Sequence, residues 1–269
     1  MSFAEMKERI NAGFPFDVNI PSPYKLTDFK PAYGTVFEEL LTPYDYWGYC
    51  DLDMIFGDIM KFVEAPMCDG KDKIYQLGHL TIYKNTESMR TLFMQKGAKF
   101  SYKTVFTNPE LYSFDEHCGQ MLIAKHQSVA EYCAEDMADI SCRTIRLTAS
   151  RQKNYDDQVF YYENGKVYRA YLEQDNVRTQ EYVYIHMQKR KYTFEKEYSC
   201  YYILSDRFAE KQPGIPSAQE IKAYSEFVSR EDDHLQMNSY RQMKKAEFFS
   251  CSLKKKWIWI HQKIAERQF

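Results

Sequence analysis

The chain of 269 residues has the length of one sizeable α/β domain with room for a smaller appendage. Its formal net charge of −2 gives no general electrostatic case for binding nucleic acid. No stretch approaches the 18 or so apolar residues that span a membrane, and residues 1–11 lack the apolar region of a signal peptide. The seven cysteines are scattered, without a Cys-x-x-Cys pair. We therefore expect reduced thiols in a cytoplasmic protein.

The first predicted elements are helical. Residues 2–12 form an amphipathic helix candidate, with Phe3, Met6 and Ile10 on one stripe. A second helix is expected from Thr27 or Asp28, with Pro31 in its first turn. Its predicted buried positions recur at helical spacing: Phe29, Tyr33, Val36, Phe37 and Leu40.

The stretch 46–50 is aromatic and uncharged, which predicts a buried central strand. Asp51 and Asp53 follow it. Alternate residues of an extended chain point the same way, so both carboxylates are expected on one side at the end of the strand. Paired oxygen donors at such a place suit a divalent cation that holds a phosphorylated substrate. The alternative for a bare Asp-x-Asp is a solvated turn.

The remaining chain alternates short helices and strands. Tyr155–Glu173 is predicted to be a hairpin turned by Asn164-Gly165, the strongest short hairpin signal. The other predicted elements are helices at 59–63, 85–94 and 114–125, strands at 74–83 (interrupted by Gly78-His79) and 181–187, and helical structure beyond 216.

Three further clusters are candidates for chemistry. Asp28 and Lys30 lie at a predicted helix start, where Asp28 has the alternative role of a cap. Asp115 and Glu116 begin another predicted helix, where the helix dipole alone explains acidic residues. His186, the third, precedes Lys189, Arg190 and Lys191. This last group offers a neutral imidazole as a metal ligand beside cations that suit a diphosphate. A metal site made of carboxylates and an imidazole suits Mn²⁺ better than Mg²⁺.

Five stretches of the chain form a joint pattern: 24–34 (YKLTDFKPAYG), 46–53 (YWGYCDLD), 56–58 (FGD), 78–85 (GHLTIYKN) and 184–190 (YIHMQKR). Together they resemble a bacterial glycosyltransferase-like family associated with surface polysaccharide synthesis. More distantly, the Asp-x-Asp segment is similar to that of GT-A enzymes of the glycogenin and galactosyltransferase type. The resemblance covers about residues 24–191 and is more specific than any single motif.

The resemblance implies a role for each candidate residue. Asp51 and Asp53 would hold Mn²⁺, or Mg²⁺, and the diphosphate of the nucleotide sugar, with His186 as the third metal ligand. Asp28, Lys30, Lys189 and Lys191 would contact the donor, with a UDP-sugar expected. Asp115 and Glu116 would line the donor-sugar or acceptor side and supply a base in an inverting route. His79 and Trp47 would contact the acceptor side. Spacing does not separate retention from inversion, although the glycogenin-like similarity favours retention.

The implied fold is a GT-A-like, Rossmann-like mixed sheet flanked by helices. We expect this catalytic domain at residues 1–205 and a helical extension at 206–269. A GT-A domain opens with an apolar strand that cradles the nucleotide base, whereas no Val/Ile-rich strand precedes Tyr24 here. The first strand of the fold is therefore expected to be missing.

The expected function is metal-dependent transfer of a sugar from a nucleotide-diphosphate donor to a glycan or lipid-linked glycan acceptor. Two alternatives stay open. One is a metal-dependent nucleotidyl- or phosphotransferase, although neither a Gly-rich phosphate loop nor a Walker lysine is present. The other is a degenerate GT-A module that binds glycan or a partner transferase.

The C-terminal segment has an apolar stripe of Leu253, Trp257, Ile260 and Ile264 among lysines. Such a stripe suits peripheral contact with the inner face of the cell membrane. The alternative, which we favour, is packing against the catalytic domain.

Overall fold

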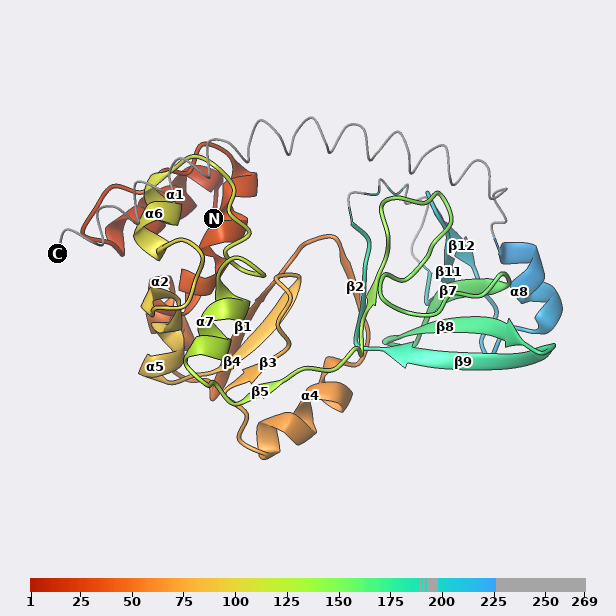
Figure 1. Cartoon of the computed structure of the whole chain (residues 1–269). Helices are drawn as coiled ribbons and strands as arrows, with labels where there is room; N and C mark the ends of the chain where they lie inside the picture. The colour runs from red at the N-terminus through yellow and green to blue at the C-terminus, as the bar shows by residue number, and fades with distance from the viewer. Residues whose placement is uncertain (189, 191, 193–197, 226–269) are drawn as a thin grey trace. The chain divides into compact units, whose positions relative to one another are not determined.

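The computed structural model describes residues 1–188, 190, 192 and 198–225, and these form a mixed α/β structure with three sheets (Figure 1). Contacts divide the chain into two compact units. The first comprises residues 1–52 and 63–134, and the second comprises residues 53–62 and the described residues from 135 onward. None of the described helices is long and apolar enough to cross a membrane.

The sheet of the first unit contains β1 (Tyr46–Cys50), β4 (Leu80–Lys84), β3 (Lys73–Ile74) and β5 (Glu131–Tyr132), in that order. The pairs β1–β4 and β4–β3 are antiparallel, and β3–β5 is parallel. The predicted strand at 46–50 is confirmed in its bounds, but the prediction that it is central and buried is wrong. β1 is the edge of this sheet, and its alternate residues Gly48 and Cys50 are exposed.

The first unit also contains several short helices. They are α1 (Phe3–Ala12), the 3₁₀ helix η1 (Pro23–Ala32), α2 (Tyr33–Val36), α3 (Glu38–Leu41), α5 (Glu87–Arg90), the 3₁₀ helix η2 (Leu92–Met94), α6 (Tyr102–Thr107) and α7 (Gln120–His126). A further helix, α4 (Ile59–Cys68), passes from the second unit into the first. α1 confirms the first predicted helix, and Ser2 and Glu5 form a capping box at its start.

Three predicted helices differ from the structure, and the one expected at 85–94 is divided into α5 and η2. The single helix expected from residue 27 is instead η1, α2 and α3, and Pro31, which has no N–H to donate to an α-helical bond, lies inside η1. Leu40, predicted as buried, is 59% exposed. The helix expected at 114–125 begins only at Gln120, so Asp115 and Glu116 lie in the turns before it.

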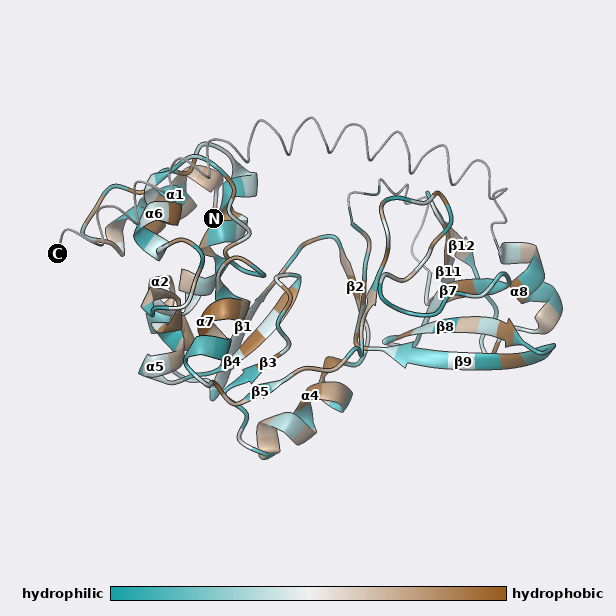
Figure 2. Cartoon of the chain, viewed as in Figure 1, coloured by the Kyte–Doolittle hydropathy of each residue, from teal (hydrophilic) through white to brown (hydrophobic). Residues whose placement is uncertain are grey.

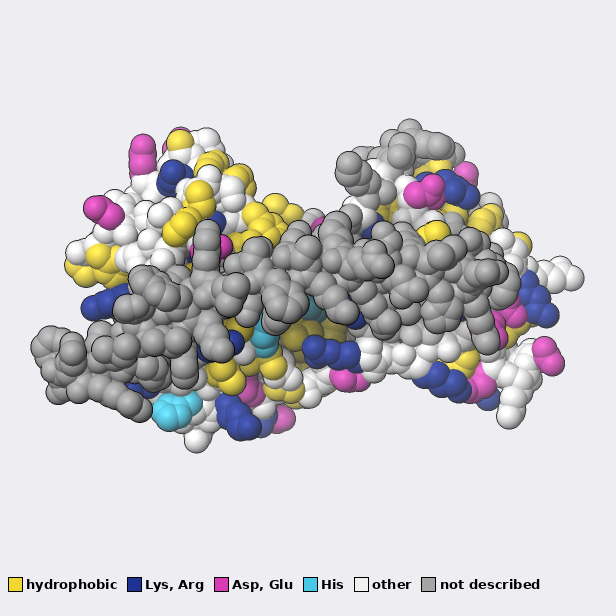
Figure 3. Space-filling view, turned by 45° about the horizontal axis from the view of Figure 1, so that its top comes forward, with side chains coloured by type: hydrophobic (Ala, Val, Ile, Leu, Met, Phe, Trp, Pro, Cys, Tyr) yellow, Lys and Arg dark blue, Asp and Glu magenta, His cyan; other side chains and the backbone are white. Residues whose placement is uncertain are grey.

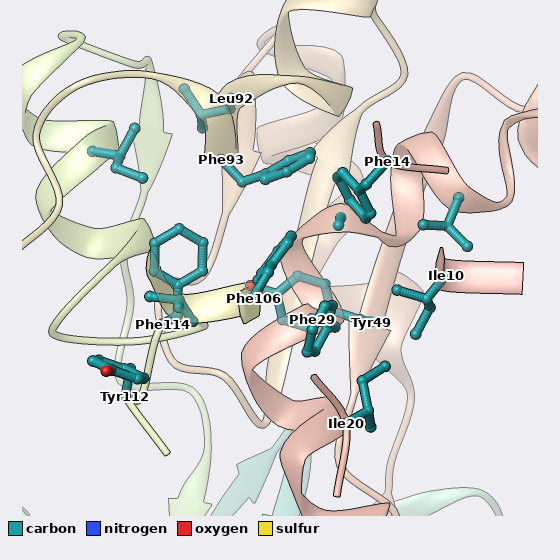
Figure 4. Close-up of a cluster of buried hydrophobic side chains, with 14 of the residues drawn as sticks. Ile10, Phe14, Ile20, Phe29, Tyr49, Leu92, Phe93, Phe106, Tyr112 and Phe114 are labelled. Carbon is teal, nitrogen blue, oxygen red and sulfur yellow. The ribbon is translucent and has the colours of Figure 1, made fainter. Parts of the chain in front are cut away.

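An aromatic cluster forms the core of the first unit (Figure 4). Phe106 lies at its centre, stacked on Phe29 with ring centroids 4.2 Å apart. Its ring also contacts those of Phe14, Phe93 and Phe114 at centroid distances of 5.2, 5.8 and 5.9 Å. Each such pair contributes about 0.5–1.5 kcal/mol beyond the area it buries. Much of the high aromatic content is thus used in packing.

The second unit contains two sheets. The smaller has the order β2 (Met54–Phe56), β10 (Tyr184–His186), β6 (Ala138–Asp139). The larger is antiparallel, with the order β12 (Phe208–Glu210), β11 (Cys200–Ile203), β7 (Gln158–Glu163), β8 (Lys166–Glu173), β9 (Asn176–Tyr182). The helix α8 (Ala218–Tyr224) packs against β7 and β8 (Figure 1).

The predicted hairpin is confirmed as β7 and β8. Asn164 and Gly165 both have positive φ, 50° and 79°, as a two-residue turn of this type requires. The strand expected at 181–187 is instead divided at Val183 between β9 and β10, which belong to different sheets. β9 is an edge strand and is mostly hydrophilic (Figure 2).

The strands are thus distributed over three sheets, where one mixed sheet was expected. The boundary predicted at residue 205 falls between β11 and β12, which pair with each other. Residues 1–23 contain α1 and no strand. The apolar stripe predicted at 253–264 lies outside the described residues. On the face shown in Figure 3, acidic and basic side chains of the described residues are interspersed.

Candidate functional site

The chain links the two units directly at the predicted Asp-x-Asp motif. Asp51 follows β1 in the first unit, and Asp53 precedes β2 in the second. The two carboxylates thus lie between the end of β1 and the start of β2. The candidate residues form two clusters, one within each unit.

The cluster in the second unit is centred on His186, which ends β10. β10 pairs with β2 antiparallel, with His186 opposite Met54, and Met187 N–H donates to the carbonyl of Asp53 at 2.9 Å. This register brings the His186 Nε2 atom to 3.4 Å from Asp53 Oδ1. The resemblance implied that Asp53 and His186 bind one metal ion although they lie far apart in the sequence. The pairing of β2 with β10 brings these two residues together.

Asp139 is a member of this cluster that sequence reasoning missed. It ends β6, which pairs with β10 in parallel, so that Asp139 lies opposite His186. Asp139 Oδ1 is 2.9 Å from His186 Nδ1 and 2.5 Å from Gln188 Nε2, whose amide donates to it. His186 thus lies between two carboxylates.

The two carboxylates control the charge of His186. Burial alone would lower its pKa, but the hydrogen bonds with Asp139 and Asp53 outweigh that effect and raise the pKa to about 9. The cluster therefore favours a positive charge at this place, in the form of either the imidazolium proton or a bound cation.

The donor set fits a divalent metal ion. Metal–ligand distances of about 2.1 Å in octahedral geometry place adjacent ligand atoms about 3 Å apart, close to the observed separation of Nε2 and Asp53 Oδ1. The Asp53 side chain is 45% exposed, which leaves its carboxylate open to an ion. Asp139 on the other ring nitrogen is the outer carboxylate that metal-binding histidines commonly have.

The cluster in the first unit is centred on Lys30, in η1. Its ammonium group binds Asp51 Oδ1, the carbonyl of Gly78 at 2.9 Å and Asp115 Oδ2 at 3.1 Å. An ammonium group has three N–H donors, and these three partners use all of them. Burial lowers the pKa of Lys30, but Asp115 and Asp51 raise it more, so Lys30 stays charged. The structure thus gives Lys30 protein partners where a contact with the donor was predicted.

Asp115 is buried with this ammonium group. Burial is the largest effect on the pKa of Asp115 and raises it. Lys30 lowers this pKa and Glu116 raises it, and the result is a pKa of about 7. Glu116 accepts a bond from Gly78 N–H at 3.1 Å. A carboxyl group that titrates near neutral pH is suited to general base catalysis.

Asp28 and Trp47 lie in the core of the first unit. The Asp28 side chain is 0% exposed and accepts bonds from Lys25 Nζ at 2.8 Å and from the N–H groups of Tyr112 and Phe114 at 3.0 and 2.9 Å. Trp47 is 3% exposed and stacks on Tyr83 with centroids 5.0 Å apart. These contacts give both residues a structural role, and neither belongs to the proposed site.

The other predicted site residues are placed as follows. His79 lies in the loop before β4, and its carbonyl accepts the N–H of Asp51 at 3.0 Å. Arg190 donates to the carbonyls of Ser141, Thr144 and Ile145, a structural role that holds the loop after β6. Lys189 and Lys191 lie outside the described residues.

Comparison with known proteins places the chain in one family. Residues 1–212 match DUF6625, a family of unknown function, and since this covers most of the chain, the protein belongs to that family. No curated protein and no solved structure matches it.

Proposed function

We propose that this protein is a metal-dependent glycosyltransferase that moves a sugar from a nucleotide-diphosphate donor to a glycan acceptor in bacterial surface polysaccharide synthesis. The observation that carries the proposal is the pairing of β2 with β10. It holds a carboxylate of the Asp-x-Asp motif against the histidine that the sequence motifs name as a metal ligand, with Nε2 and Oδ1 3.4 Å apart.

In this proposal Asp53 and His186 hold the cation, with Asp51 as the third ligand. The bound ion supplies positive charge that neutralises the departing nucleoside diphosphate. Lys189 and Lys191 keep their predicted role beside the diphosphate. A GT-A-like arrangement of the fold belongs to the proposal, as does the choice of Mn²⁺ and a UDP-sugar.

For an inverting route, Asp115 is the proposed base for the acceptor hydroxyl. Its pKa of about 7 lets it accept a proton at neutral pH, and Lys30 stabilises its ionised form. Lys30 acts here as a positioning residue that also holds Asp51, since its N–H groups are all used within the protein.

The test is thermal stability of the full chain against UDP-, GDP-, CMP- and dTDP-sugars, with and without Mn²⁺. We expect an upward shift that needs both the metal and one nucleotide, because ligands that bind only the folded state raise the melting temperature. If the melting temperature of the folded protein does not change with any donor, with or without Mn²⁺, the proposal is contradicted. That result would favour a module that binds glycan or a partner.

A further inference from the structure

Asp139 and His186 are aligned by the backbone as well as by their side chains. The parallel pairing of β6 with β10 sets Asp139 opposite His186, and Ile140 N–H donates to the carbonyl of His186 at 3.0 Å. With this register fixed, Asp139 Oδ1 meets His186 Nδ1 at 2.9 Å. The contact between Asp139 and His186 therefore follows from the pairing of β6 with β10.

Asp139 is itself held in place. Its carbonyl accepts the N–H of Ser150 at 2.7 Å, and its Oδ1 atom accepts the amide of Gln188. The side chain of Asp139 is 22% exposed, compared with 45% for Asp53. Of the two carboxylates, Asp139 is thus the more enclosed and the more constrained, while Asp53 is open to an ion.

The contact determines which ring nitrogen of His186 faces a ligand. A neutral imidazole carries one proton, and the ring nitrogen beside a fixed acceptor keeps it. In the neutral tautomer in which Asp139, the nearer carboxylate at 2.9 Å, accepts from Nδ1–H, the lone pair is on Nε2, the atom that lies 3.4 Å from Asp53 Oδ1. Metal-binding histidines are oriented in this way by an outer carboxylate.

We propose that Asp139 is a positioning residue for a divalent cation: it fixes the ring of His186 with Nε2 directed at the ion, and it does not touch the ion itself. The inference rests on the proposed function, because it takes His186 and Asp53 as ligands. The inference adds Asp139, which lies in none of the sequence motifs, to the proposed site. It also assigns Gln188 as the group that orients Asp139.

The experiment measures Mn²⁺ affinity of the full chain by the EPR signal of free Mn²⁺, without donor or turnover. The variants are Asp139→Ala and Asp139→Asn, with His186→Ala for the ligand itself. The matched control is Asp156→Ala, which removes a carboxylate of the same unit whose side chain is 81% exposed. Circular dichroism checks that each variant is folded.

Asp139→Ala is expected to raise the Mn²⁺ dissociation constant about 10–100-fold, the usual effect of removing such a partner. Asp139→Asn is expected to restore most of the affinity, because its side-chain carbonyl still accepts from Nδ1–H and from Gln188. Nitrogen NMR of the His186 ring above pH 9 adds an independent readout: the proton is on Nδ1 in the native protein, and that preference is lost in Asp139→Ala.

The outcomes separate this inference from the proposed function. If His186→Ala weakens binding and Asp139→Ala binds like Asp156→Ala, the positioning role is overturned and the metal site stands. If His186→Ala binds as the native protein does, or if the native protein does not bind Mn²⁺, both are overturned. A loss in Asp139→Ala that Asp139→Asn does not restore also contradicts the positioning role.

Discussion

Lys30 Nζ lies 3.1 Å from Asp115 Oδ2, and the same ammonium group binds Asp51. One buried cation therefore links the first carboxylate of the Asp-x-Asp motif to the proposed base. The Lys30 side chain is 7% exposed and that of Asp115 is 8%, so neither charge has a ready substitute partner in water.

Replacing Lys30 by methionine is expected to lower the free energy of unfolding by about 3 kcal/mol, because it leaves Asp115 as an uncompensated buried carboxylate. Urea denaturation at pH 8, where the native carboxyl group is ionised, measures the effect. The double variant Lys30→Met/Asp115→Asn removes the unpaired charge and should recover part of the loss. A double variant no more stable than Lys30→Met would contradict this account of the pair.

Asp115 should give the protein a recognisable pH dependence. Its folded-state pKa of about 7 lies above the ordinary value of 3.8, so the fold favours the protonated form. The stability that the protonated Asp115 carboxyl group gives the fold is fully present below pH 3.8. It is lost as the pH rises through about 7. Melting curves of the native chain and of Asp115→Asn from pH 5 to 8 isolate it. We expect the difference between them to change over this range, and a constant difference would refute the raised pKa.

Gly78→Ala is expected to disturb the same cluster. A Cβ atom on Gly78 would lie 2.2 Å from Asp115 Oδ2 and 2.9 Å from Glu116 Cγ. Because Lys30 holds the Asp115 carboxylate, relief of this overlap would displace that ion pair, at a cost of about 1–3 kcal/mol. A thermal melt compares the variant with the native chain. A melting temperature equal to that of the native chain would show that Asp115 moves freely.

Asp53→Ala is expected to abolish Mn²⁺-dependent turnover and leave the fold intact, because the carboxylate is partly exposed and proposed to bind the ion. Activity with the donor identified by thermal shift provides the measurement, and circular dichroism reports the fold. Asp156→Ala serves again as the control and should keep native activity. Retained turnover in Asp53→Ala would exclude Asp53 as a metal ligand.

Elements with strong local signals could be predicted from the sequence. Neighbouring residues alone favour a strand at 46–50 and a turn at Asn164-Gly165. The structure has β1 and the β7–β8 hairpin at the expected places in the chain. The pairing of Asp53 with His186 came from the joint pattern of motifs, a signal that no single motif carries.

The remaining features depend on contacts between distant residues. Asp139 ends a strand of only two residues, and its role comes from pairing with β10, which no local pattern indicates. The position of β1 at the edge of its sheet depends on which strand pairs with it, not on its composition. Asp28 has the pattern of a helix cap, but tertiary contacts bury it beside Lys25.

The most direct measurement is product release from nucleotide-sugar donors incubated with the full chain and Mn²⁺. The account predicts a nucleoside diphosphate that appears only with the metal and disappears in Asp53→Ala and His186→Ala. Pyrophosphate as the product would identify a nucleotidyltransferase instead. A folded, Mn²⁺-binding protein that releases neither product from any donor, with or without glycan acceptors, would contradict the assignment as a glycosyltransferase.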